Sequence, residues 1–328
     1  MILAGDIGGT NARLAFFDVI DGRLRLHSAS VFPSREYSGL EQIVSKFLSG
    51  SNLHPDSACF GVAGPVRNGR VETSNLAWVV DSKCLADQLK LDKAFLINDL
   101  EANAWGIAAL GPDDVVSLNH VKGIPVGNQV VISAGTGLGE AGMYWDGSRH
   151  RIIASEGGHA DFAPRDELEI DLFRYLSGRF GHVSYERIVS GPGLVNVFRF
   201  LCDSGRGTQP AWLTDEMANA DPAAAISRAA LNGSCQLCEQ AVDLFVSVYA
   251  AEAGNLALKL MATGGVYLGG GIAPKMLSKL CGPLFMRAFL GKGRMQPLLE
   301  AMPVKVITND KTALMGAARC AVANGRSA

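Results

Sequence analysis

A carboxylate, Asp6, stands near the start of the chain between an apolar run and the glycine turn Gly8–Asn11. A second apolar run, Leu14–Phe17, follows, so the pattern predicts two strands joined as a hairpin. Glycines in such a turn allow backbone N–H groups to converge on an anion. A carboxylate beside phosphates repels them unless a cation lies between, which indicates Mg²⁺ together with a nucleotide. No lysine follows the glycines, so the segment is either a nucleotide-binding hairpin other than a P-loop or an ordinary hairpin.

Asn98 and Asp99 follow a short apolar run at residues 94–97. They therefore stand at the carboxyl end of a predicted strand, where open α/β sheets bind their ligands. The run Asn98-Asp-Leu-Glu101 is also a good capping box for a following helix. Both interpretations hold together, because a rigid helix start suits a catalytic carboxylate.

Three ionisable residues, Glu156, His159 and Asp161, surround a pair of glycines. A metal site is less attractive here, because Glu-x-x-His without another helical His lacks a full ligand set. Carboxylates and imidazole both pair with sugar hydroxyls, and glycines let a sugar ring come close. Glu186 is a candidate for the same cluster, although by itself it is typical of a solvated glutamate, and His159 by itself of a core histidine.

A second glycine turn, Gly135-Thr136-Gly137-Leu138-Gly139, lies between apolar runs at residues 130–134 and 141–145. It repeats the strand, turn and strand pattern of the opening segment and indicates an internal duplication. Residues 137–142 also fit the dinucleotide-binding pattern G-x-G-x-x-G. That fingerprint must open a helix, whereas a strand is expected here, so we reject it.

The seven cysteines are scattered, which is typical of free thiols in a reducing cytosol. Cys235 and Cys238 form a single C-x-x-C pair on an expected helix. No second pair completes a tetrahedral site, so we expect no zinc.

Length and composition indicate an ordered protein of about two domains. The chain has 328 residues, of which 48% are hydrophobic and 19% charged. Its net charge of −2 gives no reason to expect a nucleic acid or an anionic membrane as partner. The apolar stretch 241–262 contains Asp243, Glu252 and Lys259, which favours a buried helix over a membrane span. The first residues lack a basic region and resemble a strand rather than a signal peptide, so we expect a cytoplasmic protein.

Strand and helix signals alternate along the chain, which predicts an α/β fold with a partly parallel sheet. The turn-forming residues 111–114 suggest a boundary, with a smaller domain at 1–110 plus a C-terminal helix at about 309–328, and a larger one at 111–308. Helices are expected at 40–48, 100–110, 167–180, 235–262 and 311–323, with a further helix around Leu85 and Leu89. Strands are expected at 58–63, 94–97, 130–134, 141–145 and 304–307, and a short one within 264–271.

Taken together, these segments resemble bacterial ATP-dependent glucokinases over nearly the whole chain. The matching motifs, in order, are Asp6-Ile-Gly-Gly-Thr-Asn-Ala-Arg13, Asn98-Asp99, Gly135-Thr-Gly-Leu-Gly139, Glu156-Gly-Gly-His-Ala-Asp-Phe-Ala-Pro164, Gly181-His-Val-Ser-Tyr-Glu-Arg187, Ser190-Gly-Pro-Gly-Leu194 and Gly269-Gly-Gly-Ile272. The resemblance implies the hexokinase and actin-like ATPase fold, with two ribonuclease-H-like α/β domains and an active-site cleft between them. A related branch of sugar kinases and repressors carries a cysteine-rich zinc motif. This chain has no cysteine between Cys84 and Cys202, so it differs from that branch.

The resemblance also implies a reaction and a partner: phosphorylation of glucose by ATP with Mg²⁺, the first step of glycolysis, in a homodimer. It assigns Asp99 as the catalytic base. The sugar ligands it implies are Asn98, Asp99, Glu156, His159 and Glu186. The first phosphate loop that it implies comprises Gly5, Asp6, Ile7, Gly8, Gly9, Thr10 and Asn11, and Asp6 would bind Mg²⁺. The second phosphate loop comprises Gly135, Thr136 and Gly137. The adenosine would lie against Gly269, Gly270 and Gly271. The segment Asn75-Leu-Ala-Trp78 resembles the family's sugar-side loop, to which we assign no role.

Two other functions remain open from the sequence. One is a kinase for another hexose, such as mannose or fructose. The other is a sugar and nucleotide sensor that keeps the fold without turnover. The presence of both Asp6 and Asp99 argues against a sensor, which needs neither residue.

Overall fold

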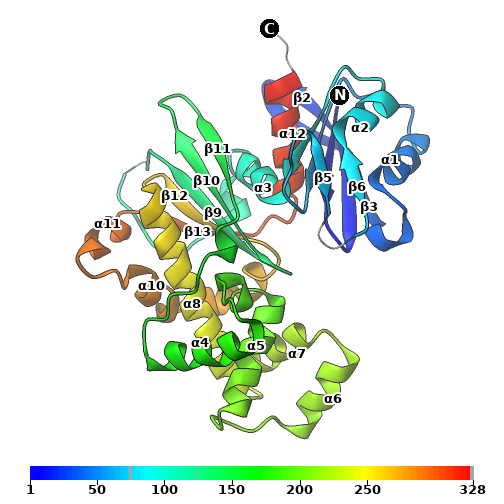
Figure 1. The fold of residues 1–328 in the computed structure, drawn as a ribbon. Helices are drawn as coiled ribbons and strands as arrows, with labels where there is room; N and C mark the ends of the chain where they lie inside the picture. Colours follow the sequence, from blue (N-terminus) through cyan, green and yellow to red (C-terminus); the bar gives the residue numbers. More distant parts are fainter. Residues whose placement is uncertain (74–75, 124, 326–328) are drawn as a thin grey trace. The chain divides into compact units, whose positions relative to one another are not determined.

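The computed structural model describes residues 1–73, 76–123 and 125–325 (Figure 1). Contacts divide the chain into two compact units. Unit 1 comprises Met1–Asp114 with Asn309–Ala328, and unit 2 comprises Val115–Thr308. The boundary that the sequence predicts at residue 110 falls just before a short 3-10 turn, Pro112–Asp114, which belongs to unit 1.

Unit 1 is built on a five-stranded sheet with the order β3-β2-β1-β4-β7. The predicted opening hairpin is present, since β1 and β2 pair antiparallel, and β3 extends it. On the other side β1, β4 and β7 run parallel. A separate pair, β5 (Arg70–Glu72) and β6 (Val79–Asp81), is antiparallel. The sheet strands are β1 (Ile2–Ile7), β2 (Asn11–Ile20), β3 (Arg23–Pro33), β4 (Ser57–Val62) and β7 (Ala94–Asn98).

Helices cover both faces of this sheet, because its central strands alternate two apolar sets of side chains. On β1, Leu3 and Ile7 join the core formed with α1 (Leu40–Ser49) and α2 (Ser82–Leu89). Ile2 and Ala4 face the opposite way, into the core formed with α12 (Thr312–Gly325). Helix α3 (Asp99–Ile107) packs along α12. The chain therefore returns at its end to complete unit 1.

Two glycines set the close approach of α3 and α12. A Cβ atom added to Gly106 would overlap the Thr312 carbonyl oxygen. A Cβ added to Gly316 would overlap the Ala102 carbonyl oxygen and lie 2.6 Å from the Gly106 nitrogen. The two backbones thus touch at this crossing, which leaves no room for any side chain.

The sheet of unit 2 repeats the arrangement of unit 1. Its order is β11-β10-β9-β12-β13-β8, with β9, β12 and β13 parallel and the hairpin strands β10 and β11 antiparallel. Among the described strands of this sheet, β8, antiparallel to β13, is the one without a counterpart in the sheet of unit 1. The predicted internal duplication is therefore confirmed at the level of topology. The strands are β8 (Val115–Ser117), β9 (Gln129–Ala134), β10 (Leu138–Trp145), β11 (His150–Ser155), β12 (Gly265–Gly269) and β13 (Val304–Ile307).

The long helix α8 (Gln236–Leu260) passes through the core of unit 2 (Figure 1). It is long and apolar enough to cross a membrane, yet 78% of its most apolar window is buried inside the protein. The prediction of a buried helix here is confirmed. The remaining helices are α4 (Glu167–Phe180), α5 (Gly191–Asp203), α6 (Ala211–Asn219), α7 (Pro222–Leu231), α9 (Leu277–Leu280), α10 (Pro283–Leu290) and α11 (Gln296–Glu300).

Candidate active site

The first glycine turn lies at the carboxyl end of β1. The Gly8 N–H donates to the Asn11 carbonyl at 3.0 Å, which closes the turn. Ser34, fully buried, anchors it from outside: its hydroxyl donates to the Gly8 carbonyl at 2.8 Å, and its N–H donates to the Thr10 carbonyl at 2.9 Å. The sequence alone does not identify Ser34, because it follows the turn by more than 20 residues in a polar stretch.

Gly5 and Ile7 lie within β1 rather than in the turn. A Cβ added to Gly5 would overlap the Phe60 ring, and the Ile7 side chain is buried in the core. These two positions therefore offer only backbone groups to a ligand.

Asp6 is a partly buried carboxylate with charged neighbours. Burial raises its pKa; Arg13, 4.0 Å away, lowers it, and the charge of Asp310 raises it. Arg13 is held by Asp310, donating to the Asp310 carbonyl at 2.7 Å and lying 3.4 Å from its carboxylate. Asp310 is a residue that the sequence alone does not connect with Asp6.

This donor set fits Mg²⁺. The cation prefers carboxylate oxygens and usually binds through one or two of them together with waters and substrate phosphates. Within the described residues no group of three or more His, Cys, Asp or Glu side chains is arranged to hold a metal. Asp6, with Asp310 nearby, therefore suits a cation that binds together with a nucleotide better than a cation held by protein ligands alone.

Asn98 and Asp99 form the start of α3, and the predicted capping box is confirmed. The Asn98 Oδ1 accepts from the Leu100 N–H at 2.8 Å, and its Nδ2 donates to the Gly64 carbonyl at 3.1 Å. Asp99, in the first helical position, accepts from the same N–H at 3.0 Å. The helix dipole favours a negative charge at this position.

Asp6 and Asp99 belong to the same edge of the unit 1 sheet. Asp6 is in register with Gly61 on the neighbouring strand β4. A Cβ added to Gly61 would lie 3.9 Å from the Asp99 Cα. The structure thus places the two carboxylates that the sequence singles out at β1 and at the end of β7, with one strand, β4, between them.

In unit 2, the two predicted nucleotide-binding turns lie side by side. Gly135–Gly137 follows β9, and Gly269–Gly271 ends and follows β12, its parallel neighbour. The Ile272 N–H donates to the Ala134 carbonyl at 3.1 Å and ties one turn to the other. Gly270 has φ of +80°, and a Cβ added to it would overlap the Ala134 carbonyl oxygen, so this position requires glycine. The α-carbon of Gly271 faces open space.

The residues predicted to bind the sugar in unit 2 lie in or beside two short 3-10 turns, η3 (Gly157–His159) and η4 (Tyr185–Arg187). The segments beside them pair, with the Tyr185 N–H donating to the Ala160 carbonyl at 3.1 Å. As a result the His159 Nδ1 lies 3.9 Å from the Glu186 Oε1. Glu156 immediately precedes η3 and is exposed. The structure therefore brings together the unit 2 side chains predicted to bind the sugar, although Glu156 and Glu186 are 30 positions apart in the sequence.

Glu186 also contacts the segment that follows the predicted phosphate turn Gly135–Gly137. Its Oε2 accepts from the Leu138 N–H at 2.9 Å. A Cβ added to Gly137 would lie 2.5 Å from the same oxygen. The glycine at position 137 is thus explained by the carboxylate that packs on it.

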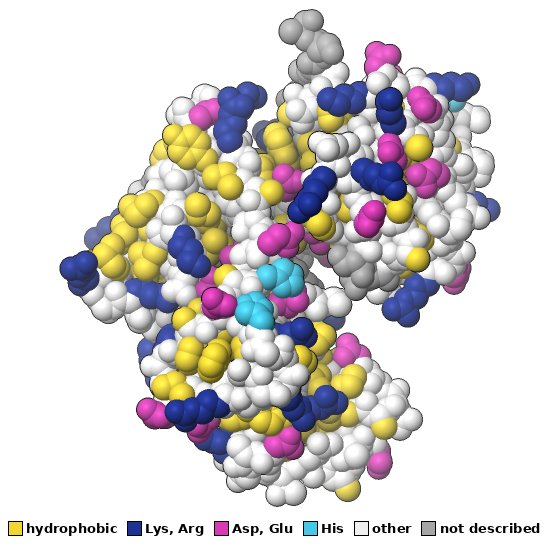
Figure 2. Space-filling view, viewed as in Figure 1, with side chains coloured by type: hydrophobic (Ala, Val, Ile, Leu, Met, Phe, Trp, Pro, Cys, Tyr) yellow, Lys and Arg dark blue, Asp and Glu magenta, His cyan; other side chains and the backbone are white. Residues whose placement is uncertain are grey.

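Asp161, the third ionisable residue of its motif, forms a different pair. It lies 2.9 Å from His182 Nε2, and both side chains are exposed. Figure 2 shows histidine side chains beside acidic ones on this face of the molecule.

The C-x-x-C pair lies at the start of α8, where Cys235 is the N-cap and Cys238 is fully buried. Burial, and then the hydrogen bond with Cys235, raise the pKa of the Cys238 thiol. Zinc binds thiolates, so protonated thiols of this kind are poor ligands.

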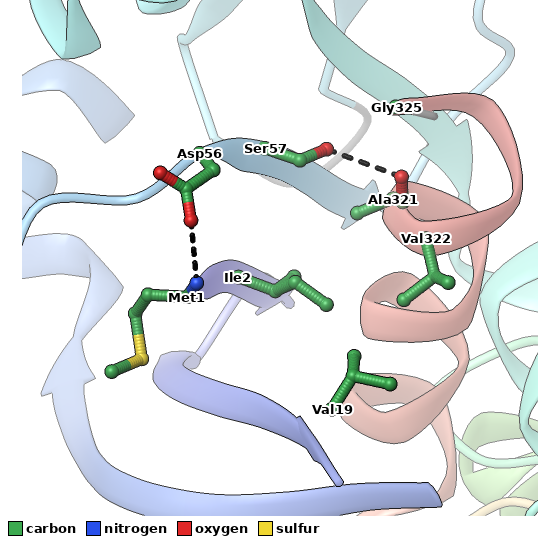
Figure 3. A pocket seen from close by; sticks show the side chains of 8 residues that line it. All are labelled: Met1, Ile2, Val19, Asp56, Ser57, Ala321, Val322 and Gly325. Carbon is green, nitrogen blue, oxygen red and sulfur yellow. Dashed lines mark hydrogen bonds and ion pairs between the residues drawn. The ribbon is translucent and has the colours of Figure 1, made fainter. Parts of the chain in front are cut away.

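One pocket opens elsewhere, at the amino ends of β1 and β4 (Figure 3). Met1, Ser57 and Val322 help to line it, and the Met1 amino group pairs with Asp56 at 2.7 Å. It lies at the end of β1 opposite to Asp6, so it is separate from the candidate site.

Comparison with known proteins agrees with this geometry. A family model described as Glucokinase matches residues 3–324. A glucokinase of Nostoc sp. (strain PCC 7120 / SAG 25.82 / UTEX 2576) is 41% identical over 338 residues, covering 98% of each chain.

Two solved structures extend the comparison. The crystal structure of a glucokinase from an Antarctic psychrotroph has a TM-score of 0.86 and 31% identity, and the match covers 98% of this chain and 99% of that one. A ROK family glucokinase from Streptomyces griseus, solved with glucose and AMPPNP, has a TM-score of 0.65 at 21% identity, covering 98% of this chain and 99% of that one; it supports the fold alone. The predicted fold class, with ribonuclease-H-like α/β domains, is confirmed. The chain therefore belongs to the glucokinase family.

Proposed function

We propose that this protein transfers the γ-phosphoryl group of ATP to the 6-hydroxyl of D-glucose, giving glucose 6-phosphate and ADP. Besides family membership, one observation carries the proposal: Glu186 contacts His159 on one side and the Leu138 N–H on the other. The proposed sugar-binding carboxylate is thus hydrogen-bonded directly beside a glycine turn suited to phosphates. That arrangement suits a reaction between a sugar and a nucleotide.

Asp99 is the proposed base for the 6-hydroxyl. Phosphoryl transfer asks mainly for alignment and charge neutralisation, so a base needs a fixed position and a negative charge. The capping box fixes the start of α3, and the helix dipole favours the charge. Asn98, whose amide is already committed to the helix start and to Gly64, would bind the sugar with its remaining hydrogen-bonding capacity.

The glycine turns are the proposed phosphate and nucleotide supports. Backbone N–H groups of Gly8–Asn11 and Gly135–Gly137 would bind phosphate oxygens, and the open face of Gly271 would receive the adenosine. Asp6 would hold Mg²⁺, which when bound supplies positive charge to the β- and γ-phosphates. The proposal requires both units to act on the same pair of substrates.

The two alternatives make different demands on the site. A sensor needs no base, whereas Asp99 is held rigidly at a helix start in the same sheet edge as Asp6. A kinase for another hexose keeps all of these residues, so only measurement separates it from a glucokinase. We also propose, from the family resemblance, that the protein acts in the cytoplasm as a homodimer.

A coupled assay for ADP release tests the proposal. We expect release that depends on glucose and on added Mg²⁺, with mannose and galactose used at least about tenfold less efficiently, because groups built for a hydroxyl reject an epimer that leaves them unpaired. Treatment with EDTA should abolish the activity and Mg²⁺ should restore it. Elemental analysis should find no stoichiometric zinc.

Equal use of several epimers would favour the other-hexose alternative. Glucose binding by calorimetry without any ADP release would favour the sensor.

If His159 and Glu156 bind the sugar, replacing them should change the KM for glucose and leave the KM for ATP nearly unchanged. His159→Ala, like Glu156→Ala, should raise the glucose KM by about tenfold or more and leave the ATP KM within about twofold, since only sugar contacts are lost. Glu186→Ala should raise both KM values, because its carboxylate also holds the strand beside Gly137.

His182→Ala is the matched control, because His182 is an exposed histidine of the neighbouring segment that pairs with Asp161. It should leave both KM values unchanged. A defect of His159→Ala that falls mainly on ATP would contradict the assignment.

A further inference from the structure

Glu140 is a buried carboxyl that the proposed reaction does not use. It lies on β10 between Ile132 of β9 and Ser155 of β11, and only 1% of its surface is exposed. Its Oε1 atom has no hydrogen-bond partner among the described residues. An unpaired buried polar atom is costly, so its presence calls for a reason.

The carboxyl of Glu140 lies directly against the Gly157–His159 turn, which carries side chains proposed to bind the sugar. A Cβ added to Gly157 would overlap the Glu140 Oε2 and would lie 3.1 Å from the Ser155 Oγ. The Gly157 N–H donates to that Oγ at 2.9 Å. A Cβ added to the next residue, Gly158, would overlap the Leu138 carbonyl oxygen. Both glycines of the turn are therefore explained by close packing on β10.

The charge of Glu140 is also controlled by its surroundings. Burial, followed by the negative charge of Glu252, raises the pKa of Glu140 to about 8, and Lys259 partly opposes this shift. Both of these charged groups project from α8, where Tyr249 is also near enough to be affected by Glu140. Near neutral pH most Glu140 side chains are therefore protonated, and the turn rests on a neutral group.

We propose that Glu140 is a positioning residue for sugar binding, which supports the Gly157–His159 turn and thereby fixes Glu156 and His159 in place. The inference rests on the proposed function of this turn. A neutral carboxyl fills the space under Gly157 without burying a charge. An ionised carboxyl would be buried and repelled by the negative charge of Glu252, and would therefore disturb the turn. Support of this kind should affect the sugar more than the nucleotide, because the Glu140 carboxyl packs on Gly157 itself, whereas the Gly135–Gly137 turn precedes β10.

Two variants separate shape from charge. Glu140→Gln keeps the shape without ionising, so at neutral pH its glucose KM should remain within about twofold of the original protein. Glu140→Ala removes the support and should raise the glucose KM by about tenfold or more, with the ATP KM nearly unchanged. Met143→Ala is the control: it removes another buried side chain of β10 and should lower stability without this split.

The pH dependence gives an independent readout. Between about pH 7 and about pH 9 the glucose KM of the original protein should rise as Glu140 ionises, while that of Glu140→Gln should stay level. Folding raises the pKa of this carboxyl from 4.5 to about 8, so the stability it contributes in acid is lost as the pH rises toward 8. Glu140→Gln escapes that loss and should have the higher Tm at about pH 9.

Equal increases of both KM values in Glu140→Ala, or a rise in the glucose KM of Glu140→Gln identical to that of the original protein, would overturn the inference. Should Glu140→Ala fail to fold, the pH comparison with Glu140→Gln still decides. Failure of the original protein to bind or phosphorylate glucose would instead refute the proposed function, and with it the role of Glu140.

Discussion

Replacement of Asp99 by asparagine should lower kcat for glucose phosphorylation at least about a hundredfold, the usual contribution of a general base. Asparagine keeps the shape of the side chain and can still accept a hydrogen bond at the start of α3, but it cannot take up the proton of the 6-hydroxyl. The glucose affinity measured by calorimetry should therefore change by less than about tenfold while turnover collapses.

Asp81→Asn is a matched control for this variant. Asp81 is also a carboxylate at a helix start in unit 1, where it accepts from the Lys83 N–H at 2.8 Å as the N-cap of α2. Asparagine caps helices about as well as aspartate, so neither stability nor kcat should change. Near-normal turnover in a folded Asp99→Asn protein would remove Asp99 from the role of base.

Gly316→Ala should lower the free energy of unfolding by about 3 kcal/mol, the upper part of the usual range for overpacking. The added methyl group would meet the Ala102 carbonyl, and backbone cannot move aside as a flexible side chain does. Helix α3 would have to shift, and Asp99 begins that helix. Turnover should therefore fall together with stability, measured by denaturant unfolding and by the coupled assay.

Gly178→Ala serves as the comparison, since Gly178 is also inside a helix, α4, but a Cβ there meets nothing within 4 Å. This substitution should stabilise the protein by about 0.5–1 kcal/mol, because alanine favours the helix and nothing obstructs it. Two equally stable glycine variants would show that α3 and α12 do not touch as described.

Elements with strong local signals were predictable from the sequence. Hydrophobic spacing or turn residues determine the secondary structure of these elements, which include both glycine hairpins, the strand 304–307 and the helix 167–180. The sequence did not reveal β3, because it is an edge strand whose mostly exposed side chains mix polar and apolar residues. It did not reveal α5 either, because Gly191, Pro192 and Gly193 resemble a loop, whereas they form the first turn of a helix capped by Ser190.

The candidate site shows a similar division. Residue types and motif order were sufficient to select Asp99, His159 and Glu186. The contacts that hold them depend on pairs distant in sequence, such as Glu186 with Leu138, 48 positions apart. No local pattern encodes such pairs, so Ser34, Asp310 and Glu140 emerge only from the folded chain.

The return of α12 to unit 1 has a consequence for how the protein is made. A ribosome releases β1, β2, β4 and β7 early, but the apolar face formed by Ile2, Ala4 and Phe17 stays uncovered until Leu314 and its neighbours on α12 emerge. Unit 2 is one continuous stretch, so it is ready to fold before unit 1 can close. Met1 and Gly325 line the same pocket (Figure 3), so a short linker suffices to join these two residues. In a circularly permuted chain that begins at Val115, each unit would be synthesised as one continuous segment. Unit 1 could then fold without waiting for a segment on the far side of unit 2.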